Sequence, residues 1–287
     1  MNVAIKNTVI KEYENLAIQL ANEAGSILAN HFNTPLQIDY KDKHERDPVT
    51  IADSTAQRHI ATTIANRYPA HGFIGEEDTV ANNSIAPDIV WVVDPLDGTK
   101  NFLNGIPMFA CSIGVLYKGI PLLGAIYLPW LGLETDTVLH ASRGNGAYIG
   151  NTRISVSKEP KPNGSRLYSS PKRLHGSMLG TNPLDIKKWE IRCIGSTVYE
   201  LAMAAKGSLQ FSSVRHPRIW DVAAGSAIIL EAGGKVLVNS RSKKWLDFIP
   251  FQSKWESLES FFPSWQSNKT RMDEIRNWSR PVIVDNT

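Results

Sequence analysis

Hydrophobic positions near the start of the chain recur at helical spacing. Over residues 8–32 the apolar side chains fall on one face, which predicts a helix with one buried side. A second helix is predicted to begin after Thr50, because Asp53 three residues later completes a capping-box pattern. It should end before Pro69. Two later segments have a helical pattern and run into glycine: 197–207 and 220–234.

Short apolar runs bounded by turn residues predict strands between these helices. The run 88–93 is rich in branched residues and has the length of a buried strand. Residues 109–117 and 120–129 are separated by Lys118-Gly119, which predicts a hairpin. Further strands are predicted at 73–75, 235–238 and 281–284, with short antiparallel strands from the hairpin to about residue 157.

The proline- and glycine-rich segment 158–164 predicts a domain boundary. We expect an N-terminal α+β domain over 1–157 and a C-terminal α/β domain over 158–287, so the fold class is mixed α/β. The irregular stretch 240–278 holds four of the eight tryptophans. We expect it to pack on the C-terminal domain, with a pocket cover or a contact with another protomer as alternatives.

Composition excludes several protein classes. With 42% hydrophobic residues in 287, the chain can build a large core without disulfides. The two cysteines, Cys111 and Cys193, form no metal or redox motif, and we expect both to be buried and reduced. A net charge of +3 is too small to indicate nucleic-acid binding. With no apolar run of membrane-spanning length and no secretory pattern, we expect a soluble cytoplasmic protein without a membrane partner.

The candidate chemistry begins where the strand 88–93 ends in two acids. Asp94 and Asp97 should project where the sheet meets a crevice, and Pro95 stiffens the turn between them. Carboxylates that converge repel one another unless a cation lies between them, and oxygen ligands suit Mg²⁺ or Ca²⁺. The alternative is a solvated turn with an aspartate cap.

Other acids and small residues could share this crevice. Glu76 and Glu77 follow the short strand 73–75, which could lie beside 88–93, although they could also belong to a charged loop. Gly98 permits close approach to a ligand, and the Thr99 hydroxyl could orient a water. As alternatives, Thr99 could belong to a plain helix cap, and Asp53 and Asp221 could be N-capping residues of their helices.

Taken together, these motifs resemble the inositol monophosphatase family of Mg²⁺-dependent, lithium-sensitive phosphatases. The matching motifs are GEED (75–78), DPLDGTKNF (94–102) and WDVAAG (220–225), with VTIAD (49–53) upstream. The resemblance implies a layered αβαβα sandwich of the inositol monophosphatase and fructose-1,6-bisphosphatase type, usually a homodimer. It also implies two or three Mg²⁺ ions that neutralise a phosphate ester and activate the attacking water.

The resemblance further implies a role for each residue. Glu76 and Asp94, with the carbonyl of Leu96, would hold the first ion. Asp94, Asp97 and Asp221 would hold the second, and Glu76 and Glu77 a third. Asp97, Gly98 and Thr99 would contact the phosphate, and Asp53 would hydrogen-bond Thr99, so that Glu76, Thr99 and Asp53 act in catalysis.

The substrate is less determined than the reaction. The resemblance places Gly195, Ser196 and Thr197 against the substrate, although Ser196 or Thr197 could cap a helix. Inositol monophosphatases carry a glutamate seven residues before the aspartate of the WD motif. That aspartate is Asp221 here, and the position of the glutamate is taken by Val214. Basic residues flank this position, which favours a second anionic group on the substrate unless they lie on the surface or at a dimer contact: Arg215, His216 and Arg218.

Several functions therefore stay open. The ester could be an inositol phosphate, histidinol phosphate, fructose 1,6-bisphosphate or 3′-phosphoadenosine 5′-phosphate. The resemblance also allows a regulatory role, because some bacterial relatives are partners of the transcription machinery. A nucleotide-binding loop at GNGAYIG (144–150) is a weak alternative, since its glycines do not follow GxGxxG and a turn explains them.

Overall fold

The structure is a computed structural model of the whole chain. It describes residues 5–35, 38–41, 43–44, 48–77, 87–129, 138–158, 167–169, 190–210, 212–214, 217–239, 245–247 and 282–285.

Most of the predicted helices are present with bounds close to those expected. The first helix, α1, spans Asn7–His31, and α2 spans Ile51–Arg67 behind the predicted capping box. A short helix, α3 (Thr99–Leu103), follows the DPLDG turn. The two C-terminal helices are α5 (Thr197–Ala205) and α6 (Ile219–Glu231).

The N-terminal half forms a seven-stranded sheet in the order β3-β4-β5-β6-β7-β8-β9. The predicted neighbours β3 and β4 pair in parallel, and the remaining pairs are antiparallel, including the predicted β5–β6 hairpin. The bounds are β3 Gly72–Gly75, β4 Ile89–Asp97, β5 Ala110–Tyr117, β6 Ile120–Tyr127, β7 Val138–Ser142, β8 Gly146–Ile149 and β9 Thr152–Ile154.

A second, six-stranded sheet is built from the C-terminal half in the order β11-β10-β12-β15-β13-β14. Its strands are β10 Leu167–Ser169, β11 Glu190–Arg192, β12 Ser212–Val214, β13 Lys235–Asn239, β14 Trp245–Asp247 and β15 Val282–Asp285. A small hairpin that the sequence pattern did not predict, β1 (Ile38–Tyr40) with β2 (Pro48–Thr50), precedes α2.

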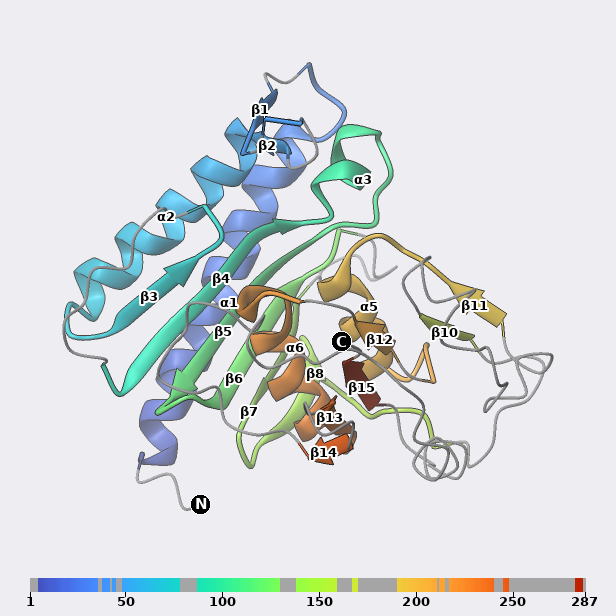
Figure 1. Cartoon of the computed structure of the whole chain (residues 1–287). Coiled ribbons are helices and arrows are strands. Elements are labelled where there is room, and N and C mark those ends of the chain that lie inside the picture. The colour runs from blue at the N-terminus through green and yellow to red at the C-terminus, as the bar shows by residue number, and fades with distance from the viewer. Residues whose placement is uncertain are drawn as a thin grey trace.

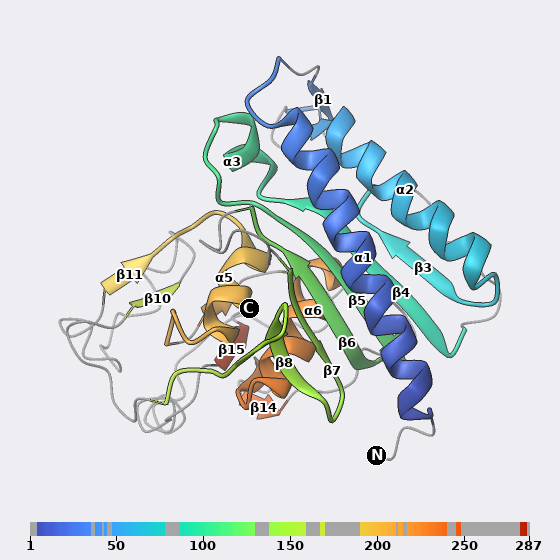
Figure 2. The same cartoon turned by 180° about the vertical axis from the view of Figure 1, so that it is seen from behind.

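The elements stack as alternating layers of helices and sheets. Figures 1 and 2 show α1 and α2 on one face of the large sheet and α5 and α6 on the other, with the second sheet beyond them. The period of two along β4 explains this arrangement, because Trp91 and Val93 pack with α1 and α2 while Val90 and Val92 pack with α5 and α6. The layered α/β fold is therefore confirmed.

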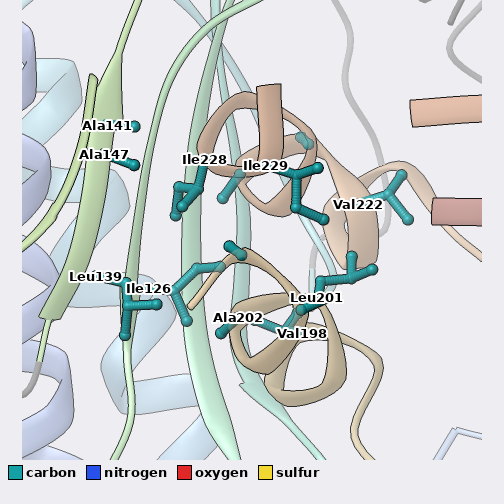
Figure 3. Close-up of a cluster of buried hydrophobic side chains, with 14 of the residues drawn as sticks. Ile126, Leu139, Ala141, Ala147, Val198, Leu201, Ala202, Val222, Ile228 and Ile229 are labelled. Carbon is teal, nitrogen blue, oxygen red and sulfur yellow. The ribbon is translucent and has the colours of Figure 1, made fainter. Parts of the chain in front are cut away.

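Two glycines let α6 lie directly on the large sheet. A Cβ on Gly114 would come within 2.9 Å of the Cβ of Ala223, and one on Gly124 would come within 2.4 Å of the Ala224 carbonyl oxygen. Figure 3 shows the apolar cluster formed where α5 and α6 meet the sheet, with Ile126, Leu201 and Ile228 among its members. The cluster takes side chains from both sides of residue 158, and the division into two domains stays a prediction.

Three other expectations have mixed outcomes. Cys111 is buried as predicted, but Cys193 is exposed because it follows the edge strand β11. Most of the tryptophan-rich stretch 240–278 lies outside the described residues. Among the helices in the described ranges, none has the length and apolar character to cross a bilayer.

Candidate metal centre

The bend at the end of β4 brings its two acids to one place. Asp94 pairs with Ser112 and Asp97 pairs with Ala110, so β4 has one residue more than β5 between these pairs. Such a β-bulge bends the strand and redirects its side chains. The amide of Leu96 donates to Asp94 Oδ1 at 3.1 Å, which holds the bend from inside.

The third acid comes from the first turn of α6. Asp221 accepts a hydrogen bond from the amide of Arg218 at 2.6 Å, so it bonds back to the N-cap of α6, and the N-cap itself is Arg218. One of its oxygens makes this bond, and its carboxylate also reaches the end of β4. The ligand oxygens of Asp94, Asp97 and Asp221 all lie within 4.8 Å of one another.

The electrostatics of this cluster are unfavourable for the protein alone. Burial, followed by the charges of Glu76, Asp97 and Asp221, raises the pKa of Asp94 well above its usual value. Burial also raises the pKa of Asp97 to about 6, and burial together with Asp97 raises that of Asp221. Carboxylates placed in this way fit a hard divalent cation, which would supply the missing positive charge.

A second pair of acids lies next to the cluster. Glu76 follows β3, its amide donates to the Val93 carbonyl at 3.1 Å, and its side chain lies within hydrogen-bonding reach of Asp94. The amide of Glu77 donates to Gln57 Oε1 at 2.9 Å. Burial raises the pKa of Glu77 to about 7, although Lys41 opposes the rise.

Lys41 is a residue of this site that the sequence pattern did not reveal. Its ammonium contacts Glu76 at 3.0 Å and Glu77 at 2.7 Å. Burial alone would lower the pKa of Lys41, and the two glutamates raise it instead. Several basic residues lie in the segment 41–47, and nothing in their pattern indicates which one folds back onto the acids.

Asp53 lies beside the glutamates but does not bond to Thr99 as the resemblance implies. Its Oδ2 accepts from the Thr50 amide at 3.0 Å and the Thr50 hydroxyl at 2.5 Å, so the capping box is confirmed. Thr99 donates instead to the carbonyl of Leu96 at 3.0 Å. Both residues are described, and no hydrogen bond joins them. Burial raises the pKa of Asp53 to about 6.

The start of α5 reaches Asp97 from the C-terminal half. Ser196 donates to Asp97 Oδ2 at 2.5 Å, and the Val198 amide donates to the same oxygen at 2.7 Å. Ser196 also accepts from the Tyr199 amide, so it caps α5. Ser196 is almost fully buried, Gly195 is exposed and Thr197 is half-buried.

Known proteins with similar sequences and folds identify the family of this chain. The model of the inositol monophosphatase family matches residues 10–259. The chain belongs to the inositol monophosphatase family. This is a family of phosphomonoesterases, so the resemblance of the sequence motifs is confirmed and the protein is a phosphatase.

Individual relatives agree with the family assignment. The chain is 34% identical to inositol monophosphatase 2 of Solanum lycopersicum, over 82% of this chain and 90% of that one. It is 33% identical to Nus factor SuhB of Escherichia coli K12, over 77% and 83%. Among solved structures, the IMPase of Thermotoga maritima has a TM-score of 0.69 and 28% identity, covering 82% of this chain and 88% of that one.

Val214, which occupies the position of the family's glutamate, is not at a surface. Val214 ends β12 with 4% of its area exposed, and it packs in the core cluster with α5 and α6. Arg218 is exposed, and its charge opposes the rise in the pKa of Asp221, so it lies near the aspartate cluster. Arg215 lies outside the described residues.

The glycine-rich turn of this family member has a local explanation. The amides of Gly144 and Gly146 each donate to the carboxylate of Glu231 at 2.9 Å. Gly146 has φ 82°, and Gly144 has φ 80°, which suits a turn between β7 and β8. A carboxylate occupies the two amides, which argues against a nucleotide-binding loop.

Proposed function

We propose that this phosphatase uses Mg²⁺ at the aspartate cluster to hydrolyse a small phosphate monoester, with an inositol 1-phosphate-like ester as the first candidate. The observation that carries the proposal is the approach of Asp94, Asp97 and Asp221, whose ligand oxygens lie within 4.8 Å of one another in a buried setting. A protein that brings three mutually repelling carboxylates together, with Asp94 almost fully buried, loses stability unless a cation offsets their charge.

The acids divide into three groups by position. Glu76 and Asp94, with the Leu96 carbonyl, would hold one ion; Asp94, Asp97 and Asp221 a second; and Glu76 with Glu77 a third. The Leu96 carbonyl accepts from Thr99, and its second lone pair is left for a cation. Magnesium, when bound, neutralises the charge of the phosphate and lowers the pKa of water, which makes water a nucleophile at neutral pH.

The remaining residues would orient the reactants. Because the Thr99 hydroxyl donates to Leu96, its oxygen is free to accept a hydrogen bond from the attacking water and fix the direction of that water. The backbone at Gly98, which has φ 88°, would contact the phosphate without a side chain in the way. Asp53 would act on Thr99 only if the Thr50 hydroxyl released it.

The choice of substrate rests on weaker observations. The relatives include a protein named fructose-1,6-bisphosphatase/inositol-1-monophosphatase from Aquifex aeolicus, 31% identical over 78% of this chain and 85% of that one. Such names favour a polyol phosphate. Val214 lies in the core and offers no carboxylate to a substrate, and the exposed Arg218 favours an ester with a second anionic group. Arg215 and Gly195 to Thr197 would complete the substrate side.

A substrate panel tests this proposal. Inositol 1-phosphate, histidinol phosphate, fructose 1,6-bisphosphate and 3′-phosphoadenosine 5′-phosphate would each be assayed with and without Mg²⁺. We expect release of phosphate only with Mg²⁺ and the highest kcat/KM for inositol 1-phosphate. Arg218→Ala should lower kcat/KM more for doubly anionic esters than for inositol 1-phosphate. Equal losses on all esters would contradict a role in substrate choice, and phosphate release without any divalent ion would contradict the metal proposal.

A regulatory function is the second candidate, because relatives from Escherichia coli, Xylella fastidiosa and Haemophilus influenzae are named Nus factor SuhB. The variant Asp97→Asn separates the two functions. If it abolishes phosphate release and leaves the cellular phenotype of a deletion complemented, a binding role is the relevant one. Homodimer formation and a cytoplasmic location stay predictions.

A further inference from the structure

A three-residue segment from the C-terminal half controls the position of one proposed metal ligand. Residues Ile194 to Ser196 connect β11 to α5, and Ser196 donates to Asp97 Oδ2. The Val198 amide holds the same oxygen. Both donors hold Oδ2, and one oxygen of this carboxylate lies within 4.8 Å of carboxylate oxygens of Asp94 and Asp221. The position of Ser196 therefore decides the orientation of this carboxylate.

The peptide groups just before Ser196 are held from two sides. Asn101, on α3, donates its Nδ2 to the Ile194 carbonyl at 2.8 Å and to the Met108 carbonyl at 2.7 Å. From the opposite direction, the Ile194 amide donates to Glu200 Oε1 at 2.8 Å. Glu200 lies on α5 with 7% of its area exposed. One side chain from each half of the molecule thus fixes the same residue.

The turn at Gly195 depends on the same two side chains. Gly195 has φ 85°, which L-residues rarely adopt, and a Cβ there would lie 3.3 Å from the amide of Asn101. Burial raises the pKa of Glu200 to about 7, while hydrogen bonds from the Ile194 and Gly195 amides oppose the rise. A buried carboxyl that accepts from two consecutive amides fixes the direction of that turn.

We propose that Asn101 and Glu200 are positioning residues that orient Asp97 for the metal through the segment 194–196. The proposal rests on the proposed function. Neither residue needs to touch metal or substrate. Each removes rotational freedom from a peptide group, and that peptide sets the direction of Ser196. We call the hydrogen bonds of these two side chains to Ile194 the clamp. Loss of either bond would let Asp97 leave the orientation that its partners in the cluster require.

The same segment is where we propose that the substrate binds, so the clamp has a second consequence. Substrate seated on Gly195 to Thr197 and metal seated on Asp97 would share one rigid element. Binding of one should therefore strengthen binding of the other, and the two effects must be equal by linkage. A substrate analogue should raise the Mg²⁺ affinity of the parent enzyme and have a smaller effect on the clamp variants.

The test is a calorimetric Mg²⁺ titration of the substrate-free protein. For Asn101→Ala and Glu200→Ala we expect Mg²⁺ to bind about tenfold more weakly, the loss of one good hydrogen bond of about 1.4 kcal/mol. At saturating Mg²⁺, kcat should recover to within about threefold of the parent. Glu200→Gln retains an oxygen acceptor for the Ile194 amide and should lose less than Glu200→Ala. Because both side chains act on one peptide, the double variant should lose less than the product of the single losses.

Matched controls are available on the same elements. Asn104 is exposed and its side chain donates to the Lys100 carbonyl within its own turn, and Glu190 is exposed on β11. Their alanine variants should keep the Mg²⁺ affinity of the parent. If an alanine variant fails to fold, Gly195→Ala disturbs the same turn from an exposed position, and it too should weaken Mg²⁺ binding.

The outcomes separate this inference from the proposed function. If the parent protein binds no Mg²⁺ and releases no phosphate, the proposed function is wrong. If the parent binds Mg²⁺ and the clamp variants bind it equally well while their Tm falls, the residues are structural only and this inference is wrong. Unchanged Mg²⁺ affinity in folded Gly195→Ala would overturn it in the same way.

Discussion

Two buried carboxylates on opposite faces of the large sheet have opposite electrostatics. Glu14, on α1, and Asp94, at the end of β4, are each 1% exposed. Glu14 accepts hydrogen bonds from Lys11 at 2.8 Å and Ser142 at 2.6 Å and contacts His140 Nδ1 at 2.8 Å. The neighbours of Asp94 are other acids.

The pKa values show what this difference means. Burial alone would raise the pKa of Glu14, but His140, Lys11 and Ser142 lower it to about 2. Burial and the neighbouring acids raise the pKa of Asp94. The fold therefore has the means to neutralise a buried acid, and it uses them around Glu14. At the aspartate cluster the negative charges repel one another, and a bound cation would have to neutralise them. This is the pattern expected of a functional site.

The largest expected effect comes from Asp94→Asn. Removing one preorganised charge from the cluster should lower kcat/KM by on the order of 10³-fold. The same change relieves repulsion with Asp97 and Asp221, so the metal-free variant should melt at or above the Tm of the parent. Steady-state kinetics and thermal melts without divalent ions measure both. A variant that lost activity and also had a much lower Tm would show that Asp94 stabilises the fold. That result would contradict the difference drawn between Asp94 and Glu14.

Glu14→Ala should have the reverse outcome. It leaves His140 and Lys11 near the cavity without their carboxylate, and breaking a buried ion pair from one side costs about 3–5 kcal/mol of unfolding free energy. Phosphatase activity measured well below the new Tm should stay within a few-fold of the parent, since Glu14 and Asp94 lie on opposite faces of the sheet. Urea denaturation gives the free energy, and Glu12→Ala on the same helix, at an exposed position, is the control.

The pH dependence of stability should follow from Glu14 in a definite direction. Its folded pKa, about 2, lies below the ordinary value of 4.5 for a glutamate. Its contribution, on the order of 3 kcal/mol, is thus fully present above pH 4.5 and is lost as the pH falls towards 2. Unfolding free energies between pH 6 and 2 should fall less steeply for Glu14→Gln than for the parent. Parallel curves would mean that Glu14 is not the group responsible.

The smallest effect is expected from Lys41→Met. Lys41 is the internal counter-ion of Glu76 and Glu77, so its loss should lower the Tm of the metal-free protein by a few degrees, on the order of 1 kcal/mol for a partly exposed pair. Added Mg²⁺ should restore more of the Tm in the variant than it adds to the parent. Lys43→Met, exposed on the same hairpin, should change neither value. If Mg²⁺ raised the Tm of both variants equally, Lys41 would not be part of the site.

The sequence predicted the parts of this site that depend on local pattern. The capping box at Thr50, the strand ending at Asp94 and the helix carrying Asp221 each follow from spacing and turn residues within about ten positions. The motifs then supplied the family, and with it the layered fold. The placement of β3 beside β4 was also expected as a possibility, and the structure adds that the two strands pair in parallel.

The parts that sequence did not reveal depend on contacts between distant segments. Lys41 reaches Glu76 across 35 positions, and Asn101 reaches Ile194 across 93. Such contacts have no periodicity. The expected bond from Asp53 to Thr99 was wrong because the Thr99 hydroxyl donates to the Leu96 carbonyl, while Asp53 closes the helix cap at Thr50. Cys193 was wrongly expected to be buried because its edge position is set by sheet order, which residue type does not determine.

The claim that an outside cation balances the buried aspartates can be tested by a crystal structure grown with Mn²⁺ as a Mg²⁺ substitute. The account predicts an anomalous peak within bonding distance, about 2.1 Å for Mg²⁺, of carboxylate oxygens from Asp94, Asp97 and Asp221. A cluster without such a peak, in crystals of a protein that still releases phosphate, would contradict it.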